Sequence, residues 1–330
     1  MSLSEENEPV SVYRDTPFLI TGAEGFIGSN LAAALVRRGG RVGVLVHPRS
    51  SLERLEKLGG RVEVFSVDIC DRKKIAALVK KFQPRKVFHL AAFTNPERDW
   101  KYLSRALAVN LGGTVNLVRA LEGSGYETLV TVCTAEVYGR NRPPFREDMP
   151  VDPVSPYSFS KAAATAFCRM SAASFKARIS IARLFLVYGP GQGRERFLPQ
   201  LIEAALAGKT FAMTSGRQTR ELTYIDDTVS GLLAVAEKGW RDGRVYNLGT
   251  GEEVSLRGLV GMVEDLTGRR VKLSRPFLPY RPNEILRLVG DHRRARRELG
   301  WCPAFTLIEG LSRTISSHRK KARPRARQRL

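Results

Sequence analysis

The chain has 330 residues, 43% of them hydrophobic and 26% charged, which excludes a disordered or collagen-like protein and predicts about two domains. No run of about 18 apolar residues occurs, and the polar, acidic first residues are unlike a secretory signal, so we expect no membrane segment. Four cysteines without a C-x-x-C pair and four scattered histidines predict no metal site and favour reduced thiols in the cytoplasm.

Short apolar runs alternate with amphipathic segments through the first half of the chain. The expected buried strands are Phe18–Thr21, Val42–Val46, Val62–Val67, Lys86–Leu90, Thr128–Cys133 and Ile179–Phe185. The expected helices are Phe26–Arg38, Ser51–Leu58, Lys73–Phe82, Leu103–Leu121 and Tyr157–Phe175. This alternation predicts an α/β fold with a doubly wound parallel sheet of the Rossmann type, which binds its ligand at the carboxyl ends of the strands.

The alternation becomes irregular after residue 185, which predicts a smaller carboxyl-terminal lobe for substrate. The elements expected there are the helices Phe197–Ala207, Asp227–Glu237 and Leu256–Leu266 and the strand Val245–Leu248. The predicted organisation is a polar extension (1–16), a dinucleotide-binding domain (17–185, with returning segments about 223–248), a substrate lobe (186–222 and 249–317) and a basic tail (318–330).

A glycine-rich segment, Thr21-Gly-Ala-Glu-Gly-Phe-Ile-Gly28, links the first strand to the first helix. Gly22 allows a tight turn, Gly25 lets the backbone approach a diphosphate, and Gly28 permits close packing of helix on strand. Free backbone N–H groups and the helix dipole favour an anion at this point. The position of the motif between strand and helix predicts a nicotinamide dinucleotide site.

The end of the second strand, Leu45-Val-His-Pro-Arg-Ser-Ser51, offers no carboxylate for the ribose hydroxyls of NAD. Arg49, with His47 and Ser50, could instead hold the 2′-phosphate of NADP. The alternative is an arginine in a solvated loop. We therefore expect NADP(H) to be favoured over NAD(H).

Tyr157 and Lys161 are four residues apart, a spacing that places both side chains on one face of a helix. A lysine ammonium near a tyrosine stabilises the phenolate and lowers the pKa of the phenol. Such a tyrosine can exchange a proton with a hydroxyl or carbonyl while hydride moves to or from nicotinamide.

Together with the glycine-rich segment and Thr134-Ala-Glu-Val-Tyr-Gly139, this pair resembles the extended short-chain dehydrogenase/reductase family. That family includes nucleotide-sugar epimerases, dehydratases, decarboxylases and 4-ketoreductases. The resemblance runs from about Phe18 to about Ser316. Further matching segments are Asp68-Ile69, His89-Leu-Ala-Ala92, Asn110-Leu-Gly-Gly-Thr114, Arg183-Leu-Phe-Leu-Val-Tyr-Gly-Pro190 and Arg220-Glu-Leu-Thr-Tyr-Ile-Asp-Asp227.

The resemblance implies roles for particular residues. Tyr157 is the acid/base, Lys161 also holds the nicotinamide ribose, and Thr134 hydrogen-bonds the reacting sugar oxygen. Cofactor contacts are implied for Gly22, Gly25, Phe26, Ile27, Gly28, His47, Arg49, Ser50, Asp68, Ile69, Leu90, Ala91, Ala92, Asn110, Tyr157, Lys161, Leu186 and Val187. Substrate contacts are implied for Thr94, Thr134, Glu136, Arg220 and Arg281, with the two arginines on the diphosphate. Asp68 could instead cap a helix, and Arg281 could be a surface charge.

Two positions depart from the pattern of the family. Dehydratases of the dTDP-glucose type have an acid where this chain has Ala135, which cannot donate a proton, so loss of the C6 hydroxyl is less favoured. Leu186 replaces an asparagine that lies near the substrate phosphates in many relatives. Glu136 is expected to be catalytic, or else to bond a loop amide in a structural role.

These observations favour an NADP(H)-dependent reductase of a 4-keto sugar on a nucleoside diphosphate. The alternative is a C4 epimerase, which needs the same Thr134, Tyr157 and Lys161; a dehydratase or a decarboxylase is less favoured. The net charge of +21, of which eight basic residues lie in residues 311–330, allows non-specific contact of the tail with nucleic acid, or a nucleic-acid-binding protein on this fold. The resemblance also implies a homodimer formed through helices 103–121 and 157–175.

Overall fold

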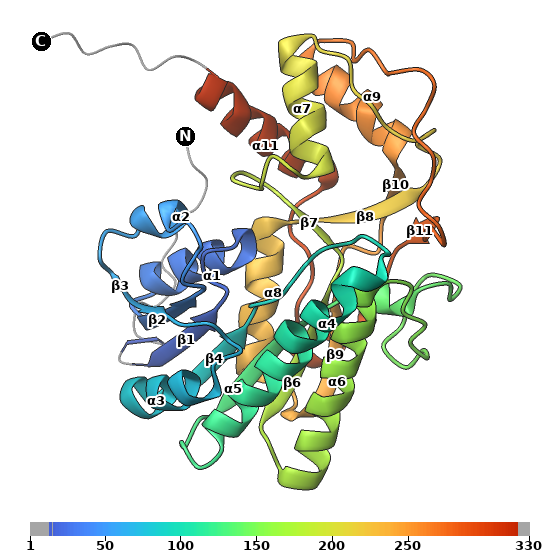
Figure 1. Ribbon diagram of the computed structural model, residues 1–330. Coiled ribbons are helices and arrows are strands. Elements are labelled where there is room, and N and C mark those ends of the chain that lie inside the picture. The colour runs from blue at the N-terminus through green and yellow to red at the C-terminus, as the bar shows by residue number, and fades with distance from the viewer. Residues whose placement is uncertain (1–12, 15, 323–330) are drawn as a thin grey trace, which may run out of the picture.

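The computed structural model describes residues 13–322 except residue 15. A seven-stranded sheet, parallel throughout, forms the centre of the first domain in the order β3-β2-β1-β4-β5-β6-β9 (Figure 1). Its strands are β1 (Pro17–Thr21), β2 (Arg41–Val46), β3 (Val62–Ser66), β4 (Lys86–His89), β5 (Thr128–Thr134), β6 (Ile179–Leu184) and β9 (Asp242–Leu248). The predicted doubly wound parallel sheet is confirmed.

Helices cover both faces of this sheet, and each face has its own apolar core. One face carries α1 (Phe26–Arg37) and α8 (Ile225–Lys238), which pack against each other. The other carries α3 (Arg72–Phe82), α5 (Gly113–Leu121) and α6 (Pro156–Phe175). The predicted helix 51–58 is reduced to the single turn α2 (Glu53–Glu56). This arrangement leaves the carboxyl ends of the strands open toward the lobe.

The predicted helix 103–121 is interrupted. The chain forms a 3₁₀ turn (Trp100–Tyr102), α4 (Leu103–Ala106), a π-helical segment (Leu107–Gly112) and then α5. A π-helical segment inserts an additional residue and shifts the phase of the side chains that follow it. Here it places Asn110 on the buried side of the helix, where its side chain is fully enclosed.

The second lobe contains a small mixed sheet flanked by helices, at the top of Figure 1. Its strands are β7 (Leu186–Tyr188), β8 (Thr219–Tyr224), β10 (Glu253–Ser255) and β11 (Arg287–Leu288), and its helices are α7 (Phe197–Ala207), α9 (Leu256–Thr267) and α11 (Leu307–Ala322). Between these pieces the chain returns to the large sheet through α8 and β9. The sequence did not indicate the short strands of the lobe, because β8 (TRELTY) and β10 (EVS) contain charged residues and lack the continuous apolar run of a buried strand.

Both ends of the described chain depart from the prediction. Tyr13, assigned to a polar extension, is buried against Phe18, and its hydroxyl contacts Glu237 on α8. Residues 318–322, assigned to the basic tail, continue α11, so the helix persists into the charged segment. Residues 1–12 and 323–330, which the prediction also placed in the extension and the tail, lie outside the described part.

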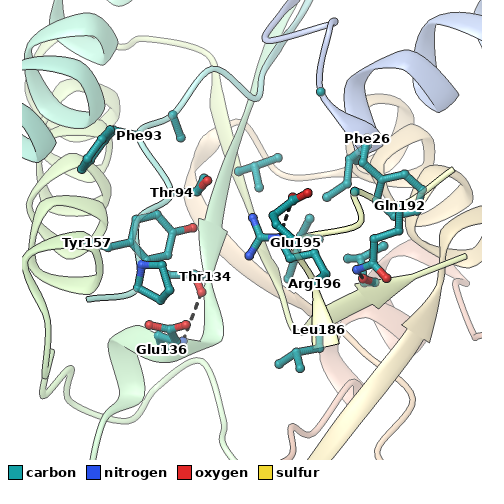
Figure 2. Close-up of a pocket in the computed structure, with 18 of the residues that line it drawn as sticks. Phe26, Phe93, Thr94, Thr134, Glu136, Tyr157, Leu186, Gln192, Glu195 and Arg196 are labelled. Atoms are coloured by element: carbon teal, nitrogen blue, oxygen red, sulfur yellow. Dashed lines mark hydrogen bonds and ion pairs between the residues drawn. The ribbon is translucent and has the colours of Figure 1, made fainter. Parts of the chain in front are cut away.

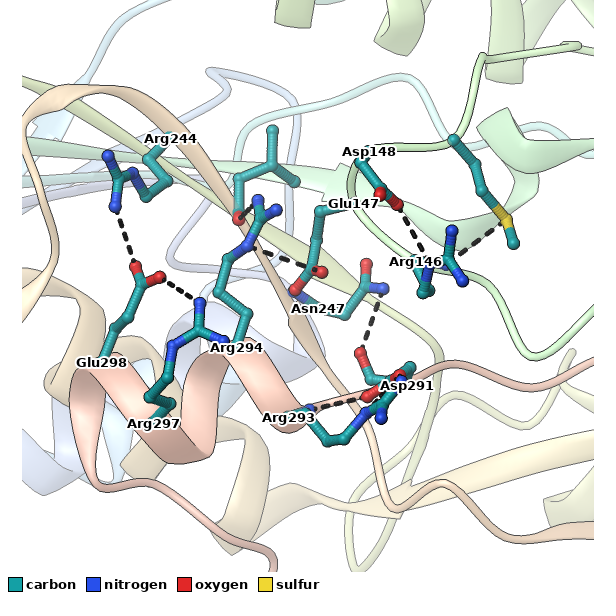
Figure 3. A network of polar contacts seen from close by, with 12 residues as sticks. Arg146, Glu147, Asp148, Arg244, Asn247, Asp291, Arg293, Arg294, Arg297 and Glu298 are labelled. Carbon is teal, nitrogen blue, oxygen red and sulfur yellow. Dashed lines mark hydrogen bonds and ion pairs between the residues drawn. The ribbon is translucent and has the colours of Figure 1, made fainter.

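A network of polar contacts joins β9 to α10 (Arg293–Leu299) and to the loop that carries Glu147 (Figure 3). The backbone N–H of Asn247 donates to Glu147 Oε1 at 2.9 Å, and its side-chain amide donates to the carbonyl of Phe145 at 2.9 Å. The Tyr138 hydroxyl donates to Asn247 Oδ1 at 2.8 Å. Arg294 donates to the carbonyl of Val245 at 3.0 Å, so the helix is joined directly to the edge strand.

In the part of the chain that the structure describes, no helix is sufficiently long and apolar to cross a membrane. Within the same residues, no three His, Cys, Asp or Glu side chains gather as metal ligands.

Candidate functional site

A cavity of about 1840 Å³ opens at the carboxyl ends of the sheet strands, between the sheet and the second lobe. Every predicted site residue except Asn110 lines it, including residues from both parts of the chain. Ligand pockets usually have volumes of about 300–1,000 Å³, so this cavity has room for a dinucleotide and a second ligand together.

The glycine-rich loop forms one end of the cavity. Gly22 has a positive φ of 71°, and a Cβ there would lie 2.6 Å from the amide nitrogen of Ala91. A Cβ at Gly28 would lie 2.4 Å from the carbonyl oxygen of Gly22. Gly25 precedes α1, which has no side-chain cap. The first N–H groups of α1 are therefore available to an anion, and the loop fits the diphosphate of a dinucleotide.

The segment after β2 has no carboxylate of its own, but the structure brings one to this turn from another loop. Glu24, from the glycine-rich loop, reaches this turn, and its Oε1 accepts from the backbone N–H of His47 at 3.1 Å and from the Ser50 hydroxyl at 3.2 Å. The reason is that β1 and β2 are neighbours, so their following loops meet at one edge of the sheet. The Arg49 side chain is exposed.

Asp68, at the end of β3, does not cap the following helix. Asp71 does so, because its Oδ1 accepts from the backbone N–H of Lys74 at 3.1 Å. Asp68 accepts from the N–H of Cys70 at 2.9 Å, and its other oxygen lies 3.8 Å from Nε2 of His47. Asp68 lines the cavity, and its cofactor contact stays a prediction.

The predicted catalytic groups come from β5 and α6 (Figure 2). Thr134 ends β5, and its hydroxyl accepts from the backbone N–H of Glu136 at 3.3 Å. Tyr157 lies in the first turn of α6, which Ser155 begins through a reciprocal capping box with Ser158. Figure 2 shows Tyr157, Thr134 and Glu136 on one wall of the cavity, with Arg196 and Gln192 on the opposite side.

The expected depression of the pKa of Tyr157 by Lys161 is not found. Burial raises the pKa of Tyr157, and the Glu136 carboxylate raises it further, while Thr134 and Arg196 oppose the rise. Burial also lowers the pKa of Lys161. Withdrawal from water is therefore the largest effect on the pKa of both groups in this structure.

Behind Lys161, a chain of hydrogen bonds fixes the neutral ring of His89. The Ala91 N–H donates to Thr21 Oγ1 at 3.1 Å, and the Thr21 hydroxyl lies 2.7 Å from Nδ1 of His89. On the other side, Nε2 lies 3.0 Å from the Thr114 hydroxyl, which donates to the carbonyl of Asn110 at 2.6 Å. Burial and the Lys161 charge lower the pKa of His89 to about 3, so the ring stays uncharged and rigid.

Asn110 lies one layer behind the cavity wall. Its Oδ1 accepts from the backbone N–H of Phe93 at 2.8 Å, and its Nδ2 donates to the Phe93 carbonyl and to the Ser160 hydroxyl. A cofactor contact of this side chain was predicted, but the structure assigns it to holding the loop after β4 against α6.

Arginines surround Glu136 at the other end of the cavity. Arg220 is mostly buried and donates to Glu284 and to the carbonyl of Thr219, while Arg281 is exposed at the rim. Burial raises the pKa of Glu136, and Arg98, Arg281 and Arg220 oppose that rise. No bond from the Glu136 carboxylate to a loop amide occurs among the hydrogen bonds of the described residues, so its predicted structural role is not supported.

Glu24 and Arg98 are among the residues of the cavity wall that sequence reasoning missed. Two nitrogens of Arg98, Nε and Nη1, are buried without a hydrogen-bond partner in the described part of the chain. Arg98 belongs to no motif, and only the fold brings it near Glu136. An acidic residue within a phosphate-binding turn was a visible signal for Glu24, since a carboxylate there opposes the phosphate charge.

Comparison with known proteins gives a consistent result. The sequence profile of the family described as GDP-mannose 4,6 dehydratase matches residues 19–314. A dTDP-glucose 4,6-dehydratase of Streptomyces griseus is 33% identical over 92% of this chain and 94% of its own. A UDP-glucose 4-epimerase of Mycolicibacterium smegmatis is 33% identical over 92% of this chain and 99% of its own.

Among solved structures, the UDP-glucuronic acid 4-epimerase of Bacillus cereus, in complex with UDP-glucuronic acid and NAD, superposes with a TM-score of 0.85. It is 28% identical, and the match covers 93% of this chain and 100% of that one. The chain therefore belongs to the GDP-mannose 4,6-dehydratase family of extended short-chain dehydrogenases/reductases, the NAD-dependent enzymes that epimerise or dehydrate nucleotide sugars.

Proposed function

We propose that the protein is a nucleotide-sugar epimerase that inverts the configuration at C4 of a hexose. The observation that carries this proposal is the shared cavity wall of Thr134, Tyr157 and Lys161, next to the glycine-rich loop. At the adjacent position Ala135 is fully buried and has no proton to give. The site thus has the groups for reaction at C4 but lacks the acid that would expel a C6 hydroxyl.

NAD bound in the cavity would supply the hydride acceptor and donor. Tyr157 would take the proton of the C4 hydroxyl and later return it to the 4-keto oxygen, since its phenol lies on the wall beside Thr134. Thr134 would hold that oxygen by a hydrogen bond, and Lys161 would hold the nicotinamide ribose. The volume of the cavity supports a turn of the keto sugar between the two steps.

The 4-keto-sugar reductase favoured by the sequence uses the same three residues. The reductase was favoured because the turn after β2 was expected to bind the 2′-phosphate of NADP. The Glu24 carboxylate, which contacts that turn, weakens this argument. The two reactions differ in balance, because a reductase consumes one reduced cofactor per product and an epimerase consumes none.

The test is incubation of the purified protein with UDP-, dTDP-, GDP- and CDP-hexoses, with NMR detection of the sugar. We expect one of them to yield its C4 epimer without net change in absorbance at 340 nm. Tyr157→Phe should lower this turnover by about 10²–10⁴-fold and leave cofactor affinity unchanged. Stoichiometric consumption of NADPH with a 4-keto sugar, or release of a 4-keto-6-deoxy sugar, would contradict the proposal.

We further propose a homodimer formed through α4, α5 and α6, and a cytoplasmic location. Phe159, Met170 and Phe175 of α6 are exposed apolar side chains, which supports a partner surface there. Light scattering at micromolar concentration should give the mass of two chains, and a monomer would exclude the dimer. Non-specific binding of nucleic acid by the basic tail also stays a prediction, to be checked by the salt dependence of binding with and without residues 318–330.

A further inference from the structure

The carboxylate of Glu24 is held between the loops that follow β1 and β2. Its Oε1 is used twice, by the backbone N–H of His47 at 3.1 Å and by the Ser50 hydroxyl at 3.2 Å. Its Oε2 is buried and has no hydrogen-bond partner among the described residues, although it belongs to a residue that lines the cavity. A buried carboxylate oxygen without a donor is costly, so this oxygen is prepared for a donor from a ligand.

We propose that Glu24 selects NAD over NADP by accepting a hydrogen bond from the adenosine ribose at Oε2. In sheets of this type the dinucleotide crosses the ends of β1 and β2, and its adenosine ribose lies at the end of β2. A ribose hydroxyl provides the missing donor. A 2′-phosphate at the same place provides none and places a second negative charge beside the carboxylate.

The charges around the turn agree with this selection. Asp68 approaches His47 from β3, with 3.8 Å between its Oδ2 and Nε2 of the ring, so the turn is flanked by two carboxylates. Arg49, expected from the sequence to hold a 2′-phosphate, has an exposed side chain, and its backbone N–H donates to His47 Nδ1 at 3.2 Å. The carboxylate that other NAD sites place at the end of β2 comes here from the glycine-rich loop.

The selection concerns the cofactor alone and is independent of which sugar reaction follows. It is measured by calorimetric titration of NAD⁺ and NADP⁺ into protein stripped of nucleotide, without any sugar. Mass spectrometry of the nucleotide released from the purified protein gives a second measure. We expect wild-type protein to release NAD and to bind NAD⁺ at least about tenfold more tightly than NADP⁺.

Glu24→Gln keeps the size of the side chain and an acceptor for His47 and Ser50, but removes the charge. We expect it to strengthen NADP⁺ binding by about tenfold or more and to change NAD⁺ binding by only a few-fold. Glu56→Gln is the matched control, because it removes the charge of an exposed carboxylate on α2 that is not part of the cavity wall, so the ratio of the two affinities should not change.

Two results would overturn the proposal. One is a wild-type protein that binds NADP⁺ as tightly as NAD⁺ and loses only NADP⁺ affinity in Arg49→Ala. The other is an equal loss of both affinities in Glu24→Gln, which would show that Glu24 only joins the two loops. Neither result bears on the C4 epimerase, whose failure would appear only in the sugar assays.

Discussion

The side chain of Asn110 donates a hydrogen bond of 2.8 Å to the hydroxyl of Ser160, the residue before Lys161 on α6. The same side chain holds both the N–H and the carbonyl of Phe93, in the loop that carries Thr94. A π-helical segment thus links the Phe93 loop to α6, two parts of the cavity wall.

Replacing Asn110 by alanine should leave these buried polar groups without partners. We expect a loss of about 1–3 kcal/mol in the free energy of unfolding and a fall in kcat/KM, because the Phe93 loop is released. Ser160→Ala, which keeps both Phe93 bonds, should have the smaller effect. Urea unfolding and steady-state kinetics of both variants check this. If Asn110→Ala has the same free energy of unfolding as the wild type, these hydrogen bonds do not contribute to stability.

The Glu136 carboxylate should control the pH dependence of Tyr157. It raises the pKa of Tyr157, so Glu136→Gln should lower that pKa. A base that ionises at lower pH moves the acidic limb of the kcat/KM profile to lower pH. The control is the same change at Glu97, which is exposed on the neighbouring loop. If the acidic limb of Glu136→Gln does not shift, the Glu136 charge does not affect the pKa of Tyr157.

Arg220 is expected to bind the substrate diphosphate in a bidentate manner, through two nitrogens of its guanidinium. Arg220→Lys should raise KM by about tenfold with kcat nearly unchanged, because an ammonium cannot form a bidentate pair and the contact is made equally in ground and transition states. Arg287→Lys is the matched control, since Arg287 pairs with Glu253 at the surface of the same small sheet. Equal KM values in the two variants would place the diphosphate elsewhere.

Glu221 should make the stability of the protein depend on pH. Burial raises its pKa to about 7, although backbone N–H groups of Gly290 and Gly251 donate to it and oppose the rise. Between its ordinary value of 4.5 and about 7, the folded state binds more protons than the unfolded state, so stability falls as pH rises.

Relative to Glu221→Gln, the wild-type free energy of unfolding should therefore decrease by about 1–3 kcal/mol from pH 5 to pH 8. Denaturant unfolding at both pH values measures this difference. Parallel pH dependence of the two proteins would show that Glu221 ionises normally.

The sheet and its ligand edge were predictable because the buried strands are short apolar runs and the long helices between them leave amphipathic patterns of ten or more residues. Thr134, Tyr157 and Lys161 could be named as candidates because each belongs to a motif, and all three line the cavity. Glu24 and Arg98 were not assigned, because their positions depend on which loops the sheet order brings together. The pKa of Tyr157 was predicted in the wrong direction, since a spacing of four residues says nothing about burial or about Glu136.

The return of the chain to the sheet through β9 has a consequence for synthesis. Strand β6 is fully buried, and β9 covers one of its edges. On the ribosome, that edge has no partner until residue 248 has left the exit tunnel, after β7, α7 and β8 of the lobe have been made. A fragment ending near residue 185 would retain the glycine-rich loop and Tyr157, yet it would expose an apolar strand edge and tend to aggregate.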